Sequence, residues 1–435
     1  MATKKKKKSA PRAVIVSGAR TPFVKAFTQY TRMDAIDLGV AAVRGLLGRT
    51  ELPWREVDSI IWGGVILPSG APNVGREIAL DIGLPPSVEG MTVTRACATG
   101  LQAVTLAAAA IERGEADVVI AGGGDSTSNA EVKLPQKVVH ALAPLMLGSK
   151  GVSPGDVLGV LSQLTPITEI LPKRPQIAER STGQLMGEAA EDMARRNEIA
   201  REDQDAFAVR SHHRAAAAIA SGRFDREVIP VETEQGLVHH DTLVRADTSV
   251  EKLKRLRPVF AKDGTLTAGN SSPLTDGAAA VLLMSEEKAR ALGYTPLAAF
   301  RSWSYVGVDP ADQLLMGPAI AMPKALERAG MTLADIDLVD MHEAFAAQVL
   351  SVQKMLASKS FAQLRLGRDE AFGEFDPEAF NVHGGSVSLG HPFGATGARM
   401  VTTVANELHL SDKQTALLGI CAAGGLGAGA VLERV

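Results

Sequence analysis

The sequence predicts a layered α/β protein made of two related halves, with an inserted segment between them. Short apolar strands alternate with helices at the start of the chain, and the same order returns after about Leu292. Segments of the two halves also align with each other. This alternation is typical of a mostly parallel sheet covered by helices. A length of 435 residues, 46% of them hydrophobic, favours two or three domains with a large close-packed core.

Apolar periodicity predicts the elements of each half in order. For the N-terminal half we expect strands at 13–17, 58–65, 91–94 and 117–121, and helices at 34–49 and 98–112. For the C-terminal half we expect helices at 320–329 and 400–408, and strands at 337–341, 416–421 and 430–433.

The halves match in detail at a spacing of about 280 to 300 residues, which indicates an internal duplication. The matched pairs are 46–62 with 325–341, 97–104 with 394–401, and 118–124 with 418–424. The duplication predicts two similar α/β layers packed on each other. It also predicts that Cys97 and Gly394 stand at the start of equivalent helices.

These patterns divide the chain into five segments. They are a disordered basic arm at 1–10, an N-terminal half at 11–130, an inserted loop domain over the active site at 131–256, the end of the N-terminal half at 257–291, and a C-terminal half at 292–435. The insertion is rich in proline and holds a predicted helical pair, 187–195 and 201–221. Its apolar stretches, 138–147 and 157–171, would pack on the insertion itself or contact a membrane or a partner chain.

Composition narrows the function classes. A net charge of −3 provides no basic field for nucleic acid or a membrane surface. Two cysteines give neither a disulfide framework nor a metal-ligand spacing, which fits a reducing compartment. No apolar run reaches the roughly 18 residues of a membrane span. The lysine run at 4–8 has no apolar core after it and lacks spaced arginines, so we expect a cytoplasmic protein.

Cys97 lies where a strand ends and a buried helix begins. The positive end of a helix dipole favours a thiolate, which is the reactive form of cysteine. An inert core cysteine is the competing interpretation, because cysteine is among the most buried residue types.

Three further stretches carry candidate chemistry. His391 stands between Gly390 and Pro392 in a glycine-framed loop before a helix, which favours a catalytic over a structural histidine. His342 and Glu343 follow the strand at 337–341, at the sheet edge where sites form, although a structural pair is an equal alternative.

Cys421 ends a buried strand and faces a glycine-rich turn. A dinucleotide fingerprint needs a following helix and room for a βαβ unit, and only six residues follow Gly429. We therefore reject that interpretation.

Taken together, these stretches resemble the thiolase family. The matching motifs are RACATG around Cys97, HEAFA at 342–346, GGSVSLGHPFGATG around His391, CAAGGLG around Cys421, and GTLTAGNSSPLTDGAAA at 264–280. The resemblance spans nearly the whole chain and is greatest to the 3-ketoacyl-CoA thiolases of the trifunctional-enzyme β-subunit type. It implies the thiolase fold: two duplicated βαβαβαββ-type halves packed as an αβαβα body with an inserted loop domain.

The resemblance also implies an activity: thiolytic cleavage of 3-ketoacyl-CoA by CoA in fatty acid β-oxidation. Cys97 would be the acyl-thioester nucleophile, His391 the general base, Cys421 the general acid/base, and His342 part of an oxyanion hole. Further residues would contact CoA or the substrate: Ser272, Met186, Phe345 and Ala423.

No metal or redox cofactor is implied, and CoA is a substrate. The family resemblance implies a homodimer or tetramer, and a heterocomplex with a hydratase/3-hydroxyacyl-CoA dehydrogenase α-subunit is a further expectation. Two positions depart from many short-chain relatives: Leu185 replaces a histidine, and His383 replaces an asparagine. Because Leu185 removes a polar group from the acyl end of the pocket, we expect medium- or long-chain substrates.

Three alternatives stay open. A biosynthetic acetoacetyl-CoA thiolase would share the active site and differ in substrate preference. A condensing synthase of the ketoacyl type would have histidine or asparagine where Cys421 stands. A non-catalytic scaffold subunit of a fatty-acid-oxidation complex would not need the intact set of Cys97, His391 and Cys421.

Overall fold

The computed structural model describes residues 10–132, 134–147, 153, 155, 157, 159–160 and 178–435. The chain forms two compact units. The larger contains the described residues up to Asn129 and those from Glu179 to Val435, and the smaller is Ala130–Ala178 with helix α4 (Gln136–Leu147). No helix in the described ranges is both long and apolar enough to cross a membrane.

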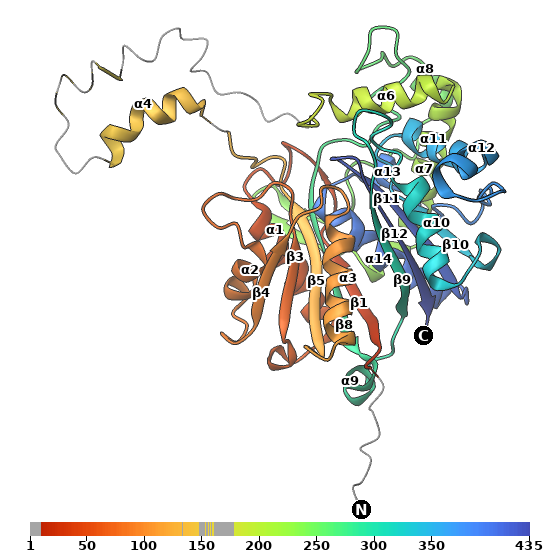
Figure 1. Ribbon diagram of the computed structural model, residues 1–435. Coiled ribbons are helices and arrows are strands. Elements are labelled where there is room, and N and C mark those ends of the chain that lie inside the picture. Colours follow the sequence, from red (N-terminus) through yellow and green to blue (C-terminus); the bar gives the residue numbers. More distant parts are fainter. Residues whose placement is uncertain are drawn as a thin grey trace, which may run out of the picture. The chain divides into compact units, whose positions relative to one another are not determined.

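The N-terminal half of the larger unit forms five neighbouring strands (Figure 1). Their order is β4 (Glu89–Val93), β3 (Ser59–Gly63), β5 (Val118–Asp125), β8 (Thr275–Ser285) and β1 (Ala13–Arg20). β3 runs parallel to both β4 and β5, whereas β8 is antiparallel to β5 and β1. The short β2 (Val24–Lys25) pairs with β8.

The C-terminal half repeats this arrangement. Its order is β10 (Leu338–Met341), β11 (Thr415–Ala422), β12 (Leu426–Arg434) and β9 (Ala298–Gly307). Among these strands only β10 and β11 are paired in parallel. The expectation of mostly parallel sheets is therefore wrong, because β8 in the first half and β12 in the second are antiparallel to both of their neighbours. An isolated parallel bridge from Val339 to Phe380 stands where β4 pairs with β3 in the first half. A single pair, Ile15 with Ala298, joins the two halves into one ten-stranded sheet.

Helices complete five layers. α3 (Thr99–Glu112) and α14 (Gly394–Leu410) share one core with the facing sides of both halves. α1 (Ala35–Thr50) and α2 (Val74–Ile82) cover the outer face of the first half. α10 (Pro318–Ala329) and α11 (Ala346–Leu356) cover the outer face of the second. The αβαβα body and the duplication predicted from the sequence are confirmed.

Small residues bring the two central helices together. A Cβ on Gly100 would lie 2.8 Å from the backbone nitrogen of Ala398 and closer still to the carbonyl oxygen of Gly394. Gly397 meets the backbone nitrogen of Leu101 in the same way. Since only glycine fits at such contacts, the sequence itself sets how closely α3 and α14 approach.

The predicted helical pair forms α6 (Met186–Arg196) and α7 (Arg201–Ala220). Ala190, Met193 and Phe207 from this pair share a core with α10 and α11, so the part of the predicted insertion from residue 179 onward lies in the larger unit. Most of the predicted apolar stretch 157–171 lies outside the described residues. The remaining elements are η1 (Trp54–Glu56), η3 (Arg223–Arg226), β6 (Val231–Thr233), β7 (Gly236–Val238), α8 (Val250–Lys254), α9 (Glu286–Ala291), η4 (Leu333–Asp335), α12 (Lys359–Phe361), η5 (Ala362–Leu366) and α13 (Ser386–Leu389).

Candidate active site

Cys97 lies on a strained turn between β4 and α3. Ala96, directly before it, has a φ of 44°, a left-handed conformation that costs a non-glycine residue about 1–3 kcal/mol. Thr99, the first helical residue, holds the turn with its hydroxyl, which accepts a hydrogen bond from the Arg95 N–H (2.6 Å) and donates one to the Ala96 carbonyl (2.6 Å). The turn therefore fixes the Cys97 side chain directly before the N-terminus of α3.

The Cys97 thiol is protonated in the resting site. Burial raises its pKa to about 11, and the charge of Asp125 acts in the same direction. A hydrogen bond from the Ala423 N–H to the sulfur lowers the pKa, but by less than burial raises it. The helix end favours a thiolate, as the sequence predicted, but desolvation outweighs the dipole in the resting site. A base has to remove this proton.

His391 brings an imidazole next to this thiol, with one ring nitrogen within 4.8 Å of the sulfur. One ring nitrogen, Nδ1, lies 2.6 Å from the Thr396 hydroxyl, and its backbone N–H donates to the Thr275 hydroxyl at 3.0 Å. Burial, and then the charge of Arg399, lower the pKa of the imidazole to about 3. The ring is therefore neutral at physiological pH. Its Nε2 is buried without a hydrogen-bond partner among the described residues, and it carries a free lone pair in the tautomer whose Nδ1–H donates to Thr396.

His342 follows β10 and lies against His391, with the ring centroids 4.1 Å apart. Its Nδ1 lies 2.9 Å from the Ser386 hydroxyl, and its Nε2 also lacks a partner in the part of the chain that is described. Burial, followed by His391 and Arg399, lowers its pKa well below the usual value. The second imidazole of the site is thus also neutral.

Glu343 fixes the loop on which Ser386 lies. Its buried carboxylate accepts hydrogen bonds from the Asn381 amide (2.7 Å), the Ser211 hydroxyl (2.7 Å) and the Val387 N–H (3.1 Å). Glu343 thus has the structural role that the alternative interpretation gave to both residues. The histidine faces the other way, toward His391.

The predicted residues meet at one place although they lie far apart in the sequence. The Cys97 sulfur and one nitrogen each of His342 and His391 all lie within 4.8 Å of one another. Cys421, at the end of β11, is fully buried, and its pKa is raised well above the usual value by burial and, whenever Cys97 is ionised, by the charge of that thiolate. Both thiols are free.

The 264–280 motif links the two histidine loops. The Ser272 N–H donates a hydrogen bond to the Ala344 carbonyl at 3.0 Å. Two isolated β-bridges, one between Ser271 and Phe345 and one between Leu274 and His391, connect the backbone segments. The role of Ser272 in binding CoA stays a prediction. The hydroxyl of the neighbouring Ser271 is buried without a partner among the described residues.

Apolar side chains gather beside this motif. The rings of Phe260 and Phe345 pack edge to face with centroids 5.8 Å apart, and Met186 packs against the same core. Leu185 is the N-cap of α6. Met186, Phe260 and Phe345 thus form an apolar group at the HEAFA loop, and Leu185 directly precedes Met186 in the chain.

Asp125 is a site residue that sequence reasoning missed. It ends β5, is fully buried, and accepts hydrogen bonds from the backbone N–H groups of Val65 (2.8 Å), Ile66 (2.6 Å) and Gly394 (2.7 Å). One carboxylate thereby connects the loop after β3 to the N-terminus of α14. Burial raises its pKa to about 7. A charged residue that closes a wholly apolar strand was the signal in the sequence.

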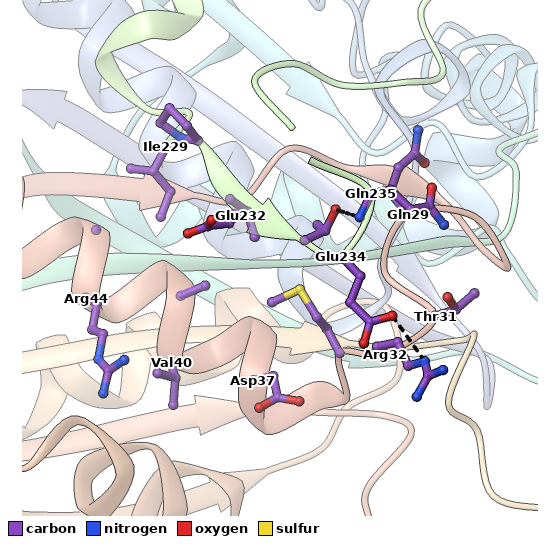
Figure 2. Close-up of a pocket in the computed structure, with 16 residues that line it drawn as sticks. Gln29, Thr31, Arg32, Asp37, Val40, Arg44, Ile229, Glu232, Glu234 and Gln235 are labelled. Atoms are coloured by element: carbon purple, nitrogen blue, oxygen red, sulfur yellow. Dashed lines mark hydrogen bonds and ion pairs between the residues drawn. The ribbon is translucent and has the colours of Figure 1, made fainter. Parts of the chain in front are cut away.

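An open cavity lies away from these residues. Figure 2 shows this open hollow of about 720 Å³ between α1 and the segment around β6, with an ion pair between Arg32 and Glu234 at its rim. Its lining mixes both signs of charge and contains no cysteine or histidine. It provides none of the nucleophiles or bases that converge at Cys97.

Comparisons with known proteins agree with this geometry. The model of the thiolase N-terminal domain matches residues 13–287, and that of the thiolase C-terminal domain matches 294–434. A 3-ketoacyl-CoA thiolase of Shewanella woodyi is 45% identical over 425 residues, 97% of each chain. One of Yersinia pestis is 46% identical over 426 residues, also 97% of each.

Solved structures are similar over the whole length. The crystal structure of the Bacillus anthracis acetyl-CoA acetyltransferase has a TM-score of 0.82 at 34% identity, covering 98% of this chain and all of that one. Human mitochondrial 3-ketoacyl-CoA thiolase in complex with CoA has a TM-score of 0.81 at 30% identity, covering 98% of this chain and 99% of that one.

Proposed function

This chain belongs to the thiolase family, and from that premise we propose which of its residues carry the reaction. The protein is an acyltransferase that cleaves 3-ketoacyl-CoA with CoA to acetyl-CoA and a shortened acyl-CoA. The observation that supports the assignment of residues is the convergence of Cys97, His342 and His391 within 4.8 Å.

In the first half-reaction, His391 Nε2 takes the proton of Cys97 and the thiolate attacks the 3-keto carbon. The bond between C2 and C3 then breaks, and its electron pair passes to the enolate of acetyl-CoA. Cys421 donates a proton to C2, which releases acetyl-CoA and leaves the shortened acyl chain as a thioester on Cys97. The proton held by His391 restores the Cys421 thiol.

In the second half-reaction, His391 takes the proton of CoA, and the CoA thiolate attacks the thioester carbonyl. Cys97 leaves as a thiolate and recovers the proton from His391. Each half-reaction develops negative charge on an oxygen. We assign His342 to one oxyanion, and the Ala423 N–H, which already donates to the Cys97 sulfur, to the other.

Trapping the acyl-enzyme tests the roles. Wild-type protein given a 3-ketoacyl-CoA without free CoA should gain the mass of the shortened acyl chain, and peptide mapping should place it on Cys97. Cys97→Ala should gain none, whereas Cys421→Ser should acylate slowly because only protonation of the enolate is impaired. Acylation of Cys97→Ala would overturn the assignment.

The substrate is a medium- or long-chain 3-ketoacyl-CoA. Leu185, Met186, Phe260 and Phe345 are apolar, and each buried CH₂ of an acyl chain stabilises binding by about 0.8 kcal/mol. The structural similarity to an acetyl-CoA acetyltransferase supports a second candidate, a short-chain acetoacetyl-CoA thiolase. Comparing kcat/KM for acetoacetyl-CoA and 3-ketohexadecanoyl-CoA decides between them, and a preference for the shorter one removes the first candidate.

We propose that the chain acts in the cytoplasm as a homodimer or tetramer that binds acyl-CoA and CoA. β4 ends the sheet with an open edge, and its Met91 is 41% exposed, which supports pairing with a second copy. A complex with a hydratase/3-hydroxyacyl-CoA dehydrogenase α-subunit fits a thiolase of this type. Size-exclusion chromatography with light scattering, alone and after co-expression, tests both assemblies.

A further inference from the structure

The catalytic centre has the donor set of a metal site. One thiol and two imidazoles converge within 4.8 Å, and both histidines are almost fully buried, with His342 0% and His391 5% exposed. The Nε2 atoms of both rings have no hydrogen-bond partner among the described residues. We propose that Cys97, His342 and His391 together bind a soft divalent cation of the Zn²⁺ class, and that this cation inhibits the enzyme.

The geometry suits such an ion. Zn²⁺ bonds sulfur at about 2.3 Å and imidazole nitrogen at about 2.0–2.1 Å, which places tetrahedral ligand atoms about 3.3–3.6 Å apart. The three donor atoms lie within 4.8 Å of one another, so side-chain movements of about 1 Å bring them to the spacing of a tetrahedral zinc site. Three protein ligands leave a fourth position for water, as in catalytic zinc sites.

The surroundings of both rings select the nitrogens that face the ion. Nδ1 of His391 is bonded to the Thr396 hydroxyl, and Nδ1 of His342 to the Ser386 hydroxyl. Hydrogen bonds of this kind orient metal-binding histidines and leave Nε2 to coordinate. Both rings are held in this way before any metal arrives, so binding requires little further ordering of the imidazoles.

Binding of the cation at Cys97 releases one proton. The cation displaces the proton of the Cys97 thiol, a metal–sulfur bond forms, and one proton goes to solvent. The carboxylate of Asp125 acts on Cys97 and favours an added positive charge, whereas Arg399 acts on both imidazoles and opposes it.

Inhibition follows from the shared sulfur. Cys97 bound to metal cannot attack a 3-keto carbon, and Cys97 already carrying an acyl group cannot bind metal. Zn²⁺ should therefore compete with 3-ketoacyl-CoA. Mg²⁺ and Ca²⁺ prefer oxygen ligands and should not inhibit at the same concentration. This kinetic part rests on the proposed function, whereas binding of the metal does not.

Cobalt titration of the full-length protein tests the site directly. Co²⁺, which takes the same ligands as Zn²⁺, should give a thiolate-to-cobalt charge-transfer band that saturates at one ion per chain. Cys97→Ser should abolish the band. His342→Asn should weaken Co²⁺ binding by more than about tenfold, the smallest loss that outer-shell changes alone produce.

Two controls separate this site from others. Cys421→Ser keeps all three proposed ligands and should keep the band, although it lacks the neighbouring thiol. His239→Asn with His240→Asn removes an exposed histidine pair, whose rings are 6.2 Å apart, and should change nothing. Circular dichroism confirms that each variant is folded.

The outcomes are distinguishable. A band that persists in Cys97→Ser, an unchanged Co²⁺ affinity in His342→Asn, or no band in active wild-type protein would each overturn the proposed metal site. A normal band in protein that cannot cleave any 3-ketoacyl-CoA would instead count against the proposed function.

Discussion

The contact between α3 and α14 makes a prediction that links packing to catalysis. Gly100 lies one turn after Cys97, and a methyl group there would meet only backbone atoms of α14, at Gly394 and Ala398. Backbone cannot rotate away, so one helix has to move. Overpacking of this kind costs about 1–3 kcal/mol, whereas glycine to alanine in an open helix position gains about 1 kcal/mol. The net of these two effects is a destabilisation of up to about 2 kcal/mol for Gly100→Ala.

The same substitution should slow catalysis. His391 precedes α14 and Cys97 precedes α3, so a shift between these helices changes the distance from base to thiol. A misplacement of about 1 Å can reduce a rate about 100-fold. We expect kcat for thiolysis to fall by about 10- to 100-fold, and the rate of Cys97 alkylation by iodoacetamide at pH 7.5 to fall with it.

Gly48→Ala is the matched control. Gly48 is an exposed residue in α1, and a Cβ there would meet nothing within 4 Å. It should stabilise the protein by about 0.5–1 kcal/mol and leave kcat unchanged. Urea unfolding and steady-state thiolysis on both variants provide the comparison. Equal stability changes in the two variants, with full activity in Gly100→Ala, would refute the reasoning.

Three further predictions follow from the buried polar groups. Burial raises the pKa of Asp125 from 3.8 to about 7, so between these pH values the folded state binds one proton that the unfolded state does not. The free energy of unfolding should therefore fall as pH rises from about 4 to about 7, by up to about 4 kcal/mol. Asp125→Asn should flatten that slope in urea titrations from pH 5 to pH 7.5, while lowering kcat because an amide cannot accept from all three N–H groups. Thr396→Val removes the hydroxyl that orients His391. It should lower kcat by about 5- to 160-fold, which corresponds to about 1–3 kcal/mol for an unpaired buried group, and leave the KM for CoA nearly unchanged. Because the pKa of His391 is lowered to about 3, the profile of kcat/KM against pH should show no acidic limb from this imidazole near pH 6.5, whereas a limb there that vanishes in His391→Asn would contradict the assignment.

The sequence was sufficient to place each reactive residue at the end of an element. Cys97 before α3, His391 before α14 and Cys421 at the end of β11 were all expected there, because apolar runs and glycine-rich turns mark such boundaries. The duplicated halves were also expected. The duplication predicted that Cys97 and Gly394 stand at the start of equivalent helices, and the family resemblance predicted that the reactive residues share one site.

The electrostatics could not be predicted in the same way. The state of the Cys97 thiol depends on burial by residues hundreds of positions away, and this burial reverses the effect expected from the helix end. The roles of Asp125 and Glu343 depend on backbone N–H groups and loops that converge only in the folded chain. The charged end of an apolar strand marked Asp125 in the sequence, but nothing there marked its partners, because backbone N–H groups are donors whatever residue carries them.

The duplication itself explains why a carboxylate lies at the centre of this site. Two helix N-termini, each equivalent to roughly half a positive charge, meet at α3 and α14 at backbone contact distance. This pair of positive ends is useful when an enolate or an alkoxide forms, but it is unfavourable in the empty resting site. Asp125 accepts the first N–H of α14 and acts electrostatically on Cys97 before α3, so its charge offsets both ends. Its raised pKa lets it give up that charge when the reaction develops a negative charge of its own. Three features therefore act together: the strained turn at Ala96, the glycine contacts and this carboxylate. They hold two positive helix ends next to each other around a thiol that stays neutral until substrate arrives.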